Sequence, residues 1–209
     1  VRQEGLQYMI LTNANYYSLE ANREYMSVSQ YKQFKKCEAA AMAQIRGEWE
    51  QEQTTALLVG SYVDAWFEGT LEEFKKEHPE IFKKDGTLKA DFQQAEDIIA
   101  RVQKDKVFMY YMSGRKQLIR TAELFGCKWK IKIDSRLRDK VVDLKVMRSM
   151  ERIMGKSFVE HWGYDLQMAV YAAVEEKALK RKSPLSTYLA VATKQTPADL
   201  DVIEIPQWR

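Results

Sequence analysis

Residues 129–146 read WKIKIDSRLRDKVVDLKV, and this stretch decides the fold that we expect for the chain. Two strands are expected here, at 128–137 and 140–146. Polar and apolar residues alternate in the first strand, and β-branched residues crowd the second. Only Arg138-Asp139 separates the two, so a tight connection joins them as a hairpin.

The charged side chains of this hairpin are expected to converge. Strand alternation places Asp143 and Lys145 on one face of the second strand, and it places Asp134 on the polar face of the first. The tight connection then brings all three within reach of one another. Burying two carboxylates and an ammonium on a sheet face is unfavourable for folding. Their presence there therefore suggests a function. A surface hairpin held by a salt bridge is the simpler alternative.

This grouping of side chains suits a divalent metal ion. Mg²⁺, or Mn²⁺ in its place, prefers oxygen ligands and usually takes one or two carboxylates together with water and phosphate. Asp134 and Asp143 could supply the carboxylates, and the main-chain carbonyl of Leu144 could add a third ligand. Lys145 could position or deprotonate a water molecule, or it could stabilise charge on a phosphate.

The rest of the chain predicts an α/β protein, with a mixed central β-sheet flanked by helices and a helical N-terminal half. The strand before the hairpin should continue it into a three-strand meander. Helices are expected at about 30–45, 54–68, 89–104 and 163–180, and further strands at about 117–125, 186–193 and 201–205. Residues 1–209 are expected to form one domain, helical at about 25–112 and with its sheet core at about 113–206.

Composition excludes several classes of protein. The 209 residues are 45% hydrophobic, which is enough for a buried core. No apolar run reaches ~18 residues and no signal peptide is visible, so neither a membrane partner nor secretion is expected. Two cysteines cannot form a disulfide framework, which favours a reducing cytoplasm. The net charge of +3 is compatible with a site that combines acidic ligands and basic phosphate contacts.

Five segments, taken in order, carry a family resemblance. They are Ser27-Val-Ser29 to Cys37, Gly60 to Gly69 around Asp64, Glu123 and Gly126 before Asp134, Asp143-Leu-Lys145, and Gly163 to Tyr171 with its Gln167-x-x-x-Tyr171 pair. In this order they resemble the PD-(D/E)xK nuclease superfamily, in particular the RecB-like and RecE-like phage-type exonucleases. The match extends over about residues 25–205.

The resemblance implies a restriction-endonuclease-like core and a Mg²⁺- or Mn²⁺-dependent deoxyribonuclease. The expected activity is exonucleolytic, on linear double-stranded DNA in phage recombination or repair. Asp134, Asp143 and Lys145 would be catalytic. Gln167 and Tyr171 would join them, because four residues apart they share one face of a helix. A ring-like homo-oligomer around DNA and a phage-type single-strand annealing protein are the protein partners that the resemblance suggests.

Several alternatives stay open at this point. The chain could be a catalytically inactive DNA-binding or recombination-partner module, or an endonuclease. Asp64 stands where many RecB-like members carry a histidine metal ligand, and an aspartate there could also bind Mg²⁺. Glu123 could bind the metal or pair with a neighbouring lysine. Gln167 and Tyr171 could also be a satisfied amide and a core aromatic.

Basic residues near the acids could contact phosphate. They are Lys130, Lys132, Arg136, Arg148 and the cluster at 177–182, which would equally complement the dipole of its own helix. The two histidines, His78 and His161, are too isolated to predict a zinc site. Cys37 and Cys127 are too few for a four-thiolate iron–sulfur cluster.

Overall fold

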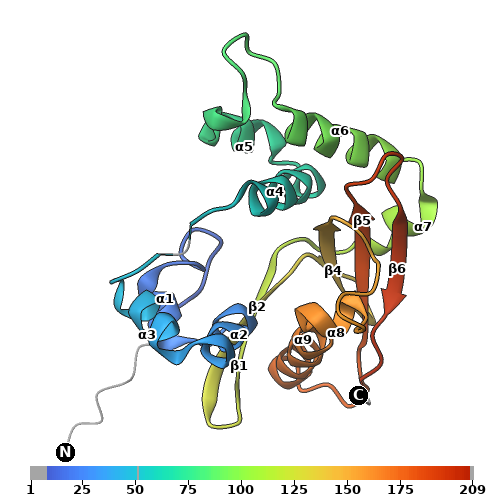
Figure 1. The fold of residues 1–209 in the computed structure, drawn as a ribbon. Helices are drawn as coiled ribbons and strands as arrows, with labels where there is room; N and C mark the ends of the chain where they lie inside the picture. Colours follow the sequence, from blue (N-terminus) through green and yellow to red (C-terminus); the bar gives the residue numbers. More distant parts are fainter. Residues whose placement is uncertain (1–8, 51, 208–209) are drawn as a thin grey trace, which may run out of the picture.

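The computed structural model describes residues 9–50 and 52–207, and a four-stranded sheet lies at its centre in the order β3-β4-β5-β6. β4 (Lys140–Met147) and β5 (Ser186–Thr193) are parallel. β3 (Ser135–Arg136) and β6 (Leu200–Glu204) run antiparallel to their neighbours. The predicted α/β class with a mixed sheet is therefore confirmed, and Figure 1 shows the sheet beside its covering helices.

Helices cover the sheet on both faces. α8 (Phe158–Trp162) and α9 (Tyr164–Ala178) connect the parallel strands β4 and β5, since such strands need a crossover. α9 packs on one face, against Val141, and α4 (Thr55–Glu68) and α6 (Ala90–Val102) pack on the other. β4 is consequently buried on both sides from Val141 to Leu144, and any charged residue in that run lies inside the protein.

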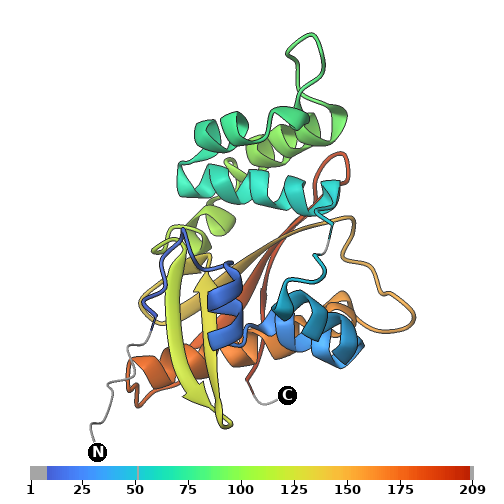
Figure 2. The ribbon, with the colours of Figure 1, turned by 90° about the vertical axis from the view of Figure 1, so that its left-hand side faces the viewer.

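The three-strand meander expected from the sequence is wrong. β1 (Leu118–Leu124) and β2 (Cys127–Ile133) form a separate two-stranded ribbon, and the chain bends at Asp134 before β3 begins. The bend has a local cause, because the carboxylate of Asp134 accepts a hydrogen bond from the Leu144 N–H and takes the place of a strand partner. Figure 2 shows the long ribbon standing beside the N-terminal helices.

The N-terminal half is helical, as predicted, but it is divided more finely. Its elements are α1 (Leu19–Glu24), α2 (Val28–Lys36), α3 (Glu38–Arg46), α4, α5 (Leu71–Glu77), the 3-10 helix η1 (Pro79–Ile81), α6 and α7 (Lys106–Tyr111). Ser27 caps α2 in a capping box. The single helix expected at 30–45 breaks at Cys37, whose extended backbone (φ −161°) ends α2 and starts α3. This break lets α3 fold back onto α2.

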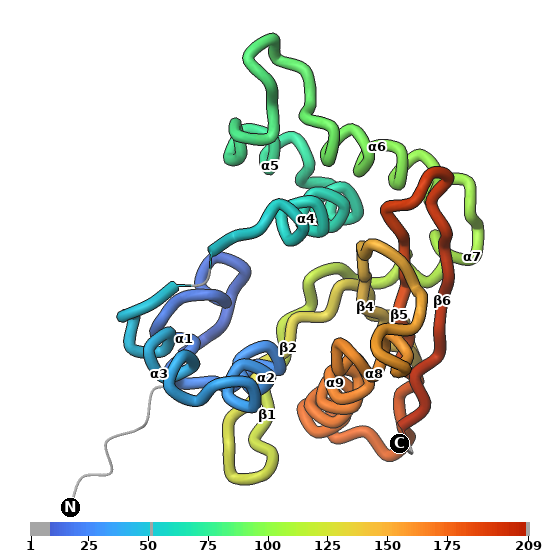
Figure 3. Tube along the Cα trace, viewed as in Figure 1, coloured from blue at the N-terminus to red at the C-terminus, as the bar shows by residue number. Residues whose placement is uncertain are grey.

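Two groups of helices result, α1–α3 and α4–α6, and Figure 3 traces the chain from one to the other. Met26 ties the first group to the ribbon by a parallel bridge with Trp129. The second group rests on the sheet through the apolar side chains of α4 and α6. None of the helices described is both long and apolar enough to cross a membrane.

Candidate active site

A cavity of about 420 Å³ opens where both helix groups meet the ribbon, β4 and α9. All seven residues expected to be catalytic or to bind the metal, apart from the open candidate Glu123, line it, namely Asp64, Asp134, Asp143, Leu144, Lys145, Gln167 and Tyr171. These residues come from four separate parts of the chain, so only the tertiary fold brings them together. Their chemical roles stay a prediction at this point.

Asp134 lies at the bend between β2 and β3, and its backbone neighbourhood fixes its carboxylate. Oδ2 accepts a hydrogen bond of 2.8 Å from the main-chain N–H of Leu144 on β4. Burial, followed by repulsion from Asp143, raises the pKa of Asp134 to about 7. The carboxylate is thus held in a place where its negative charge is poorly stabilised by the protein alone.

Asp143 is the most buried of the three acids of the site, with only 3% of its surface exposed. Gln167 on α9 donates a hydrogen bond of 2.8 Å from Nε2 to Oδ1 of Asp143, and the Lys145 ammonium forms an ion pair with Oδ2. Burial disfavours the charged form of Lys145. The carboxylates of Asp143 and Asp134 outweigh that effect, so the pKa of Lys145 is raised above its usual range.

Asp64 reaches the same cavity from the helix α4 on the opposite side. Burial and then the negative charge of Asp134 raise the pKa of Asp64 well above its ordinary value. The adjacent Lys145 ammonium acts in the other direction. Three carboxylates therefore line a confined space in which Lys145 forms an ion pair with one of them, and their mutual repulsion is the kind of strain that a bound cation relieves.

The sequence analysis did not single out Lys32 of α2, which lines the cavity, or Tyr164 at the start of α9, whose ring contacts the lysines of the site. The two residues form a cation–π contact, with Lys32 Nζ 5.3 Å from the centroid of the Tyr164 ring. Lys145 Nζ lies 5.0 Å from the same centroid. Burial and the charge of Lys145 lower the pKa of Lys32 to about 8. Neither residue carries a recognisable spacing signal, because α2 and α9 are more than a hundred residues apart.

Tyr171 lies one helical turn beyond Gln167 and lines the cavity as expected. Burial, then the charge of Asp143, raises the pKa of its hydroxyl well above the ordinary value. Its ring also packs against the apolar core under α9. Tyr171 is therefore partly a core aromatic, the alternative that the sequence left open.

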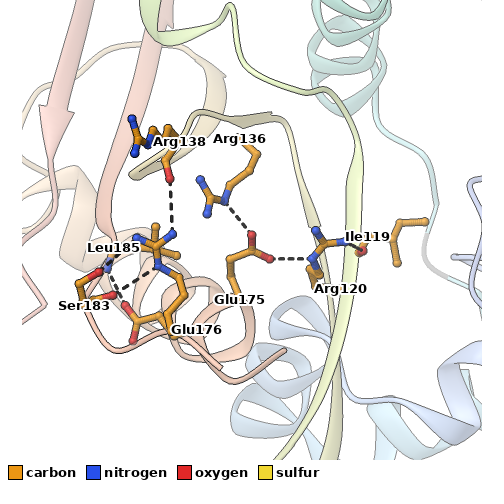
Figure 4. Close-up of polar contacts among 9 residues, drawn as sticks. Ile119, Arg120, Arg136, Arg138, Glu175, Glu176, Ser183 and Leu185 are labelled. Atoms are coloured by element: carbon orange, nitrogen blue, oxygen red, sulfur yellow. Dashed lines mark hydrogen bonds and ion pairs between the residues drawn. The ribbon is translucent and has the colours of Figure 1, made fainter. Parts of the chain in front are cut away.

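Lys130 and Arg136, two of the expected phosphate contacts, are occupied inside the protein. The Lys130 side chain is buried, and its ammonium donates to the Tyr16 carbonyl at 2.6 Å and to Asn22 Oδ1 at 2.7 Å. Arg136 pairs with the buried Glu175 at 2.7 Å, and Figure 4 shows Glu175 bridging it to Arg120. Both expectations are corrected, because each cation already has a fixed internal partner.

Other candidates lie away from the acids. Glu123 is exposed and sits opposite Lys128, and Asp134 lies about 20 Å farther along the ribbon. The cluster at 177–182 begins in the last turn of α9, at the other end of this helix from Gln167. Arg148 does not line the cavity. Lys132, in contrast, lines the cavity.

A second cavity, of about 620 Å³, adjoins the first. Tyr17, Asp64, Lys132 and Asp134 line both cavities. The walls differ in charge. The first cavity carries Lys32, Lys130, Lys132 and Lys145, whereas the second carries Glu68, Glu73 and Glu77 beside His78.

The donor set fits a magnesium-type ion. Asp143 Oδ2 is buried and has no aligned hydrogen-bond donor, although the Lys145 ammonium lies beside it. Within residues 9–50 and 52–207, no three acidic, histidine or cysteine side chains converge closely enough to hold an ion alone. Mg²⁺ does not need such a cage, since it takes one or two carboxylates and completes its coordination with water and phosphate.

Comparison with known proteins identifies the family of the chain. The family model DUF3799, described as a PDDEXK-like domain of unknown function, matches residues 27–209. A crystal structure from Eubacterium rectale, described as a "Putative exonuclease", is 51% identical, with a TM-score of 0.91 over 95% of this chain and 79% of its own. The structure of SSO0001 is 14% identical and covers 85% of this chain and 80% of its own, with a TM-score of 0.30. None of the curated proteins matches the chain.

Proposed function

The chain belongs to the PDDEXK-like family, and on that premise we propose that it is a metal-dependent nuclease that hydrolyses phosphodiester bonds of DNA. We further propose that it acts as an exonuclease on linear double-stranded DNA. One observation carries the proposal, which is the convergence of Asp134, Asp143 and Lys145 in a single cavity. Burying such a set is unfavourable for folding, and a protein that only binds DNA has no need of all three.

The proposed metal ligands are Asp134, Asp143 and the main-chain carbonyl of Leu144, with Asp64 next to them. A bound Mg²⁺ or Mn²⁺ ion would supply a Lewis acid that activates water and neutralises charge on the phosphate. The chain prepares this site through its own contacts. Leu144 N–H holds Asp134, and Gln167 holds Asp143, so neither carboxylate needs to reorient.

Lys145 is proposed to stabilise negative charge on the phosphate that undergoes hydrolysis. Its ammonium already sits against Asp143 inside the cavity, and a strand holds its backbone. An ammonium group fixed in a confined site stabilises a developing negative charge more strongly than the same group does in water. Tyr171 lines the wall next to Gln167, where it could contact the substrate.

A cleavage assay tests this function. Purified protein is incubated with end-labelled linear duplex DNA and Mg²⁺ or Mn²⁺, and EDTA should stop the reaction. Asp143→Asn and Lys145→Met should each lower the rate at least a hundredfold. Asp139→Asn is the matched control, because Asp139 lies in the same hairpin but is exposed. Full activity in Asp143→Asn would rule out the proposed site.

Circular duplex DNA separates the exonuclease from the endonuclease. The proposal expects closed circles to persist while linear molecules are degraded. Tight DNA binding without cleavage at any divalent ion would favour the inactive DNA-binding module instead. The ring-like homo-oligomer and the annealing-protein partner stay predictions. The mass of the protein and of its complexes in solution would test both.

A further inference from the structure

Tyr17 is an exposed aromatic residue at the junction of the two cavities. Its side chain is 70% exposed, and it lines both cavities together with Lys132 and the acids Asp64 and Asp134. A ring that is exposed in this way is available to stack against a ligand that enters either cavity.

The segment that carries Tyr17 is held in place. The ring packs edge-on against the buried Tyr16, with centroids 4.9 Å apart. The main-chain carbonyl of Tyr16 in turn accepts a hydrogen bond from the Lys130 ammonium. Ser18 caps α1 directly after Tyr17, and the Asn22 amide donates to the Tyr17 carbonyl at 3.3 Å. The ring is thus presented by a fixed backbone, which lowers the entropy lost when a ligand stacks on it.

Lys132 lies beside the ring, with its Nζ 4.8 Å from the centroid. In the part of the chain that the structure describes, no carboxylate lies within ion-pair distance of Lys132. An ammonium next to an accessible ring matches the two halves of a nucleotide, a phosphate and a base. A base in the interior of a duplex offers no free face for stacking, so the ring suits a base that is unpaired or at a strand end.

The charges of the two cavities give the strand a direction. In the first cavity, lysines balance the carboxylates of Asp64, Asp134 and Asp143. The second cavity shares Asp64, Asp134 and Lys132 and adds Glu68, Glu73 and Glu77, so it repels a phosphate backbone more strongly. A strand is therefore expected to arrive through the first cavity and to end near Tyr17, where the acidic wall begins.

From these contacts we infer that Tyr17 is a stacking site for the unpaired terminal nucleobase of a DNA strand, with Lys132 beside its phosphate. The inference rests on the proposed function in taking DNA as the ligand, and it makes the substrate in the cavity a single strand, even when the DNA outside is double-stranded. Tyr17 acts here as a positioning residue for the strand end.

Binding of a fluorescent oligonucleotide tests the inference. The probe is a short oligodeoxythymidine with one terminal 2-aminopurine, whose fluorescence falls on stacking, and EDTA prevents metal-dependent cleavage. The wild-type chain should quench the probe. Tyr17→Ala should weaken its binding about tenfold and abolish the quenching, whereas Tyr17→Phe should retain both. Tyr110→Ala is the control, since Tyr110 is 54% exposed but lines neither cavity.

An abasic terminal nucleotide completes a double-mutant cycle. It should weaken binding to the wild-type chain as much as Tyr17→Ala does, and it should have no further effect on that variant. The stacking site would be overturned if the abasic nucleotide weakened binding equally in the wild type and in Tyr17→Ala. Unchanged quenching in Tyr17→Ala, or no binding of the single strand, would also overturn it. Cleavage of the same probe by the wild-type chain with Mn²⁺ is measured separately. Tyr17-dependent binding without cleavage refutes the nuclease and leaves the stacking site intact, whereas cleavage without Tyr17 dependence refutes only the stacking site.

Discussion

Gln167 donates a hydrogen bond from its amide to Oδ1 of Asp143 across 2.8 Å, and this contact links α9 to the buried strand β4. Lys145 occupies the other oxygen of the same carboxylate. A donor on Oδ1 fixes the plane of the carboxylate and so fixes where its second oxygen points. Contacts of this kind around a metal ligand affect metal affinity and activity without touching the metal.

We expect Gln167→Leu, which preserves the volume but removes the donor, to weaken Mn²⁺ binding and lower the nuclease rate by about 10–100-fold. Isothermal titration with Mn²⁺ and the linear-duplex assay measure the two effects. Gln93→Leu, on the exposed face of α6, is the control and should change neither. A Gln167→Leu protein with wild-type metal affinity would show that the hydrogen bond serves packing only.

The raised pKa of Asp134 predicts a pH-dependent stability. Since the folded protein holds this proton up to a pKa of about 7, whereas an unfolded aspartate loses it near its ordinary value, the folded state binds more protons over that interval. In EDTA the free energy of unfolding should therefore fall as the pH rises from about 5 to 8, with a contribution from Asp134 on the order of 2 kcal/mol.

Asp134→Asn checks this prediction by urea denaturation at several pH values. The variant should be more stable than the wild type at pH 8 in EDTA, and the difference should shrink towards pH 5. Mn²⁺ should stabilise the wild-type chain at pH 8 but not the variant, because a ligand that binds only the folded state adds to its stability. Identical pH profiles of the two proteins would contradict the proposed strain at Asp134.

Glu175 is predicted to be a structural residue whose loss destabilises the whole fold. Its side chain is 1% exposed, and its carboxylate forms ion pairs with Arg120 at 2.9 Å and Arg136 at 2.7 Å. These contacts join α9 to both β1 and β3 (Figure 4). Glu175→Gln leaves two partly buried guanidinium groups without their counter-ion, which should cost about 3–5 kcal/mol in unfolding free energy. Glu72→Gln breaks an exposed pair with Lys75 and should cost less than about 1 kcal/mol. Similar losses in both variants would contradict this role.

Two neighbouring lysines of β2 should behave differently in DNA binding. Lys130 holds the N-terminal segment from inside, so Lys130→Met should lower stability by about 1–3 kcal/mol and leave the salt dependence of DNA affinity unchanged. Lys132 faces the cavity, so Lys132→Met should reduce the slope of log affinity against log salt by about one. Fluorescence anisotropy over a salt series measures both slopes. A reduced slope in Lys130→Met would contradict its internal role.

The sequence by itself determined the features that depend on local spacing. The helix expected at about 54–68 is found as α4, because its cap at Thr54 and its left-handed end at Gly69 act within one turn. Asp143 and Lys145 fall on one strand two residues apart, and Gln167 and Tyr171 lie one helical turn apart, so each pair was expected to share a face. These regularities were enough to predict an α/β fold and one site.

Only the tertiary structure decided what depends on partners far away in the chain. The alternation that placed Lys130 and Lys132 on one face could not show that Asn22 and the Tyr16 carbonyl capture one of them and leave the other at the cavity. Nor could it show that Asp134 bends the chain by accepting the Leu144 N–H. A side chain's environment is set by elements that arrive from elsewhere, and packing rather than spacing brings Tyr17 and Lys32 to the acids.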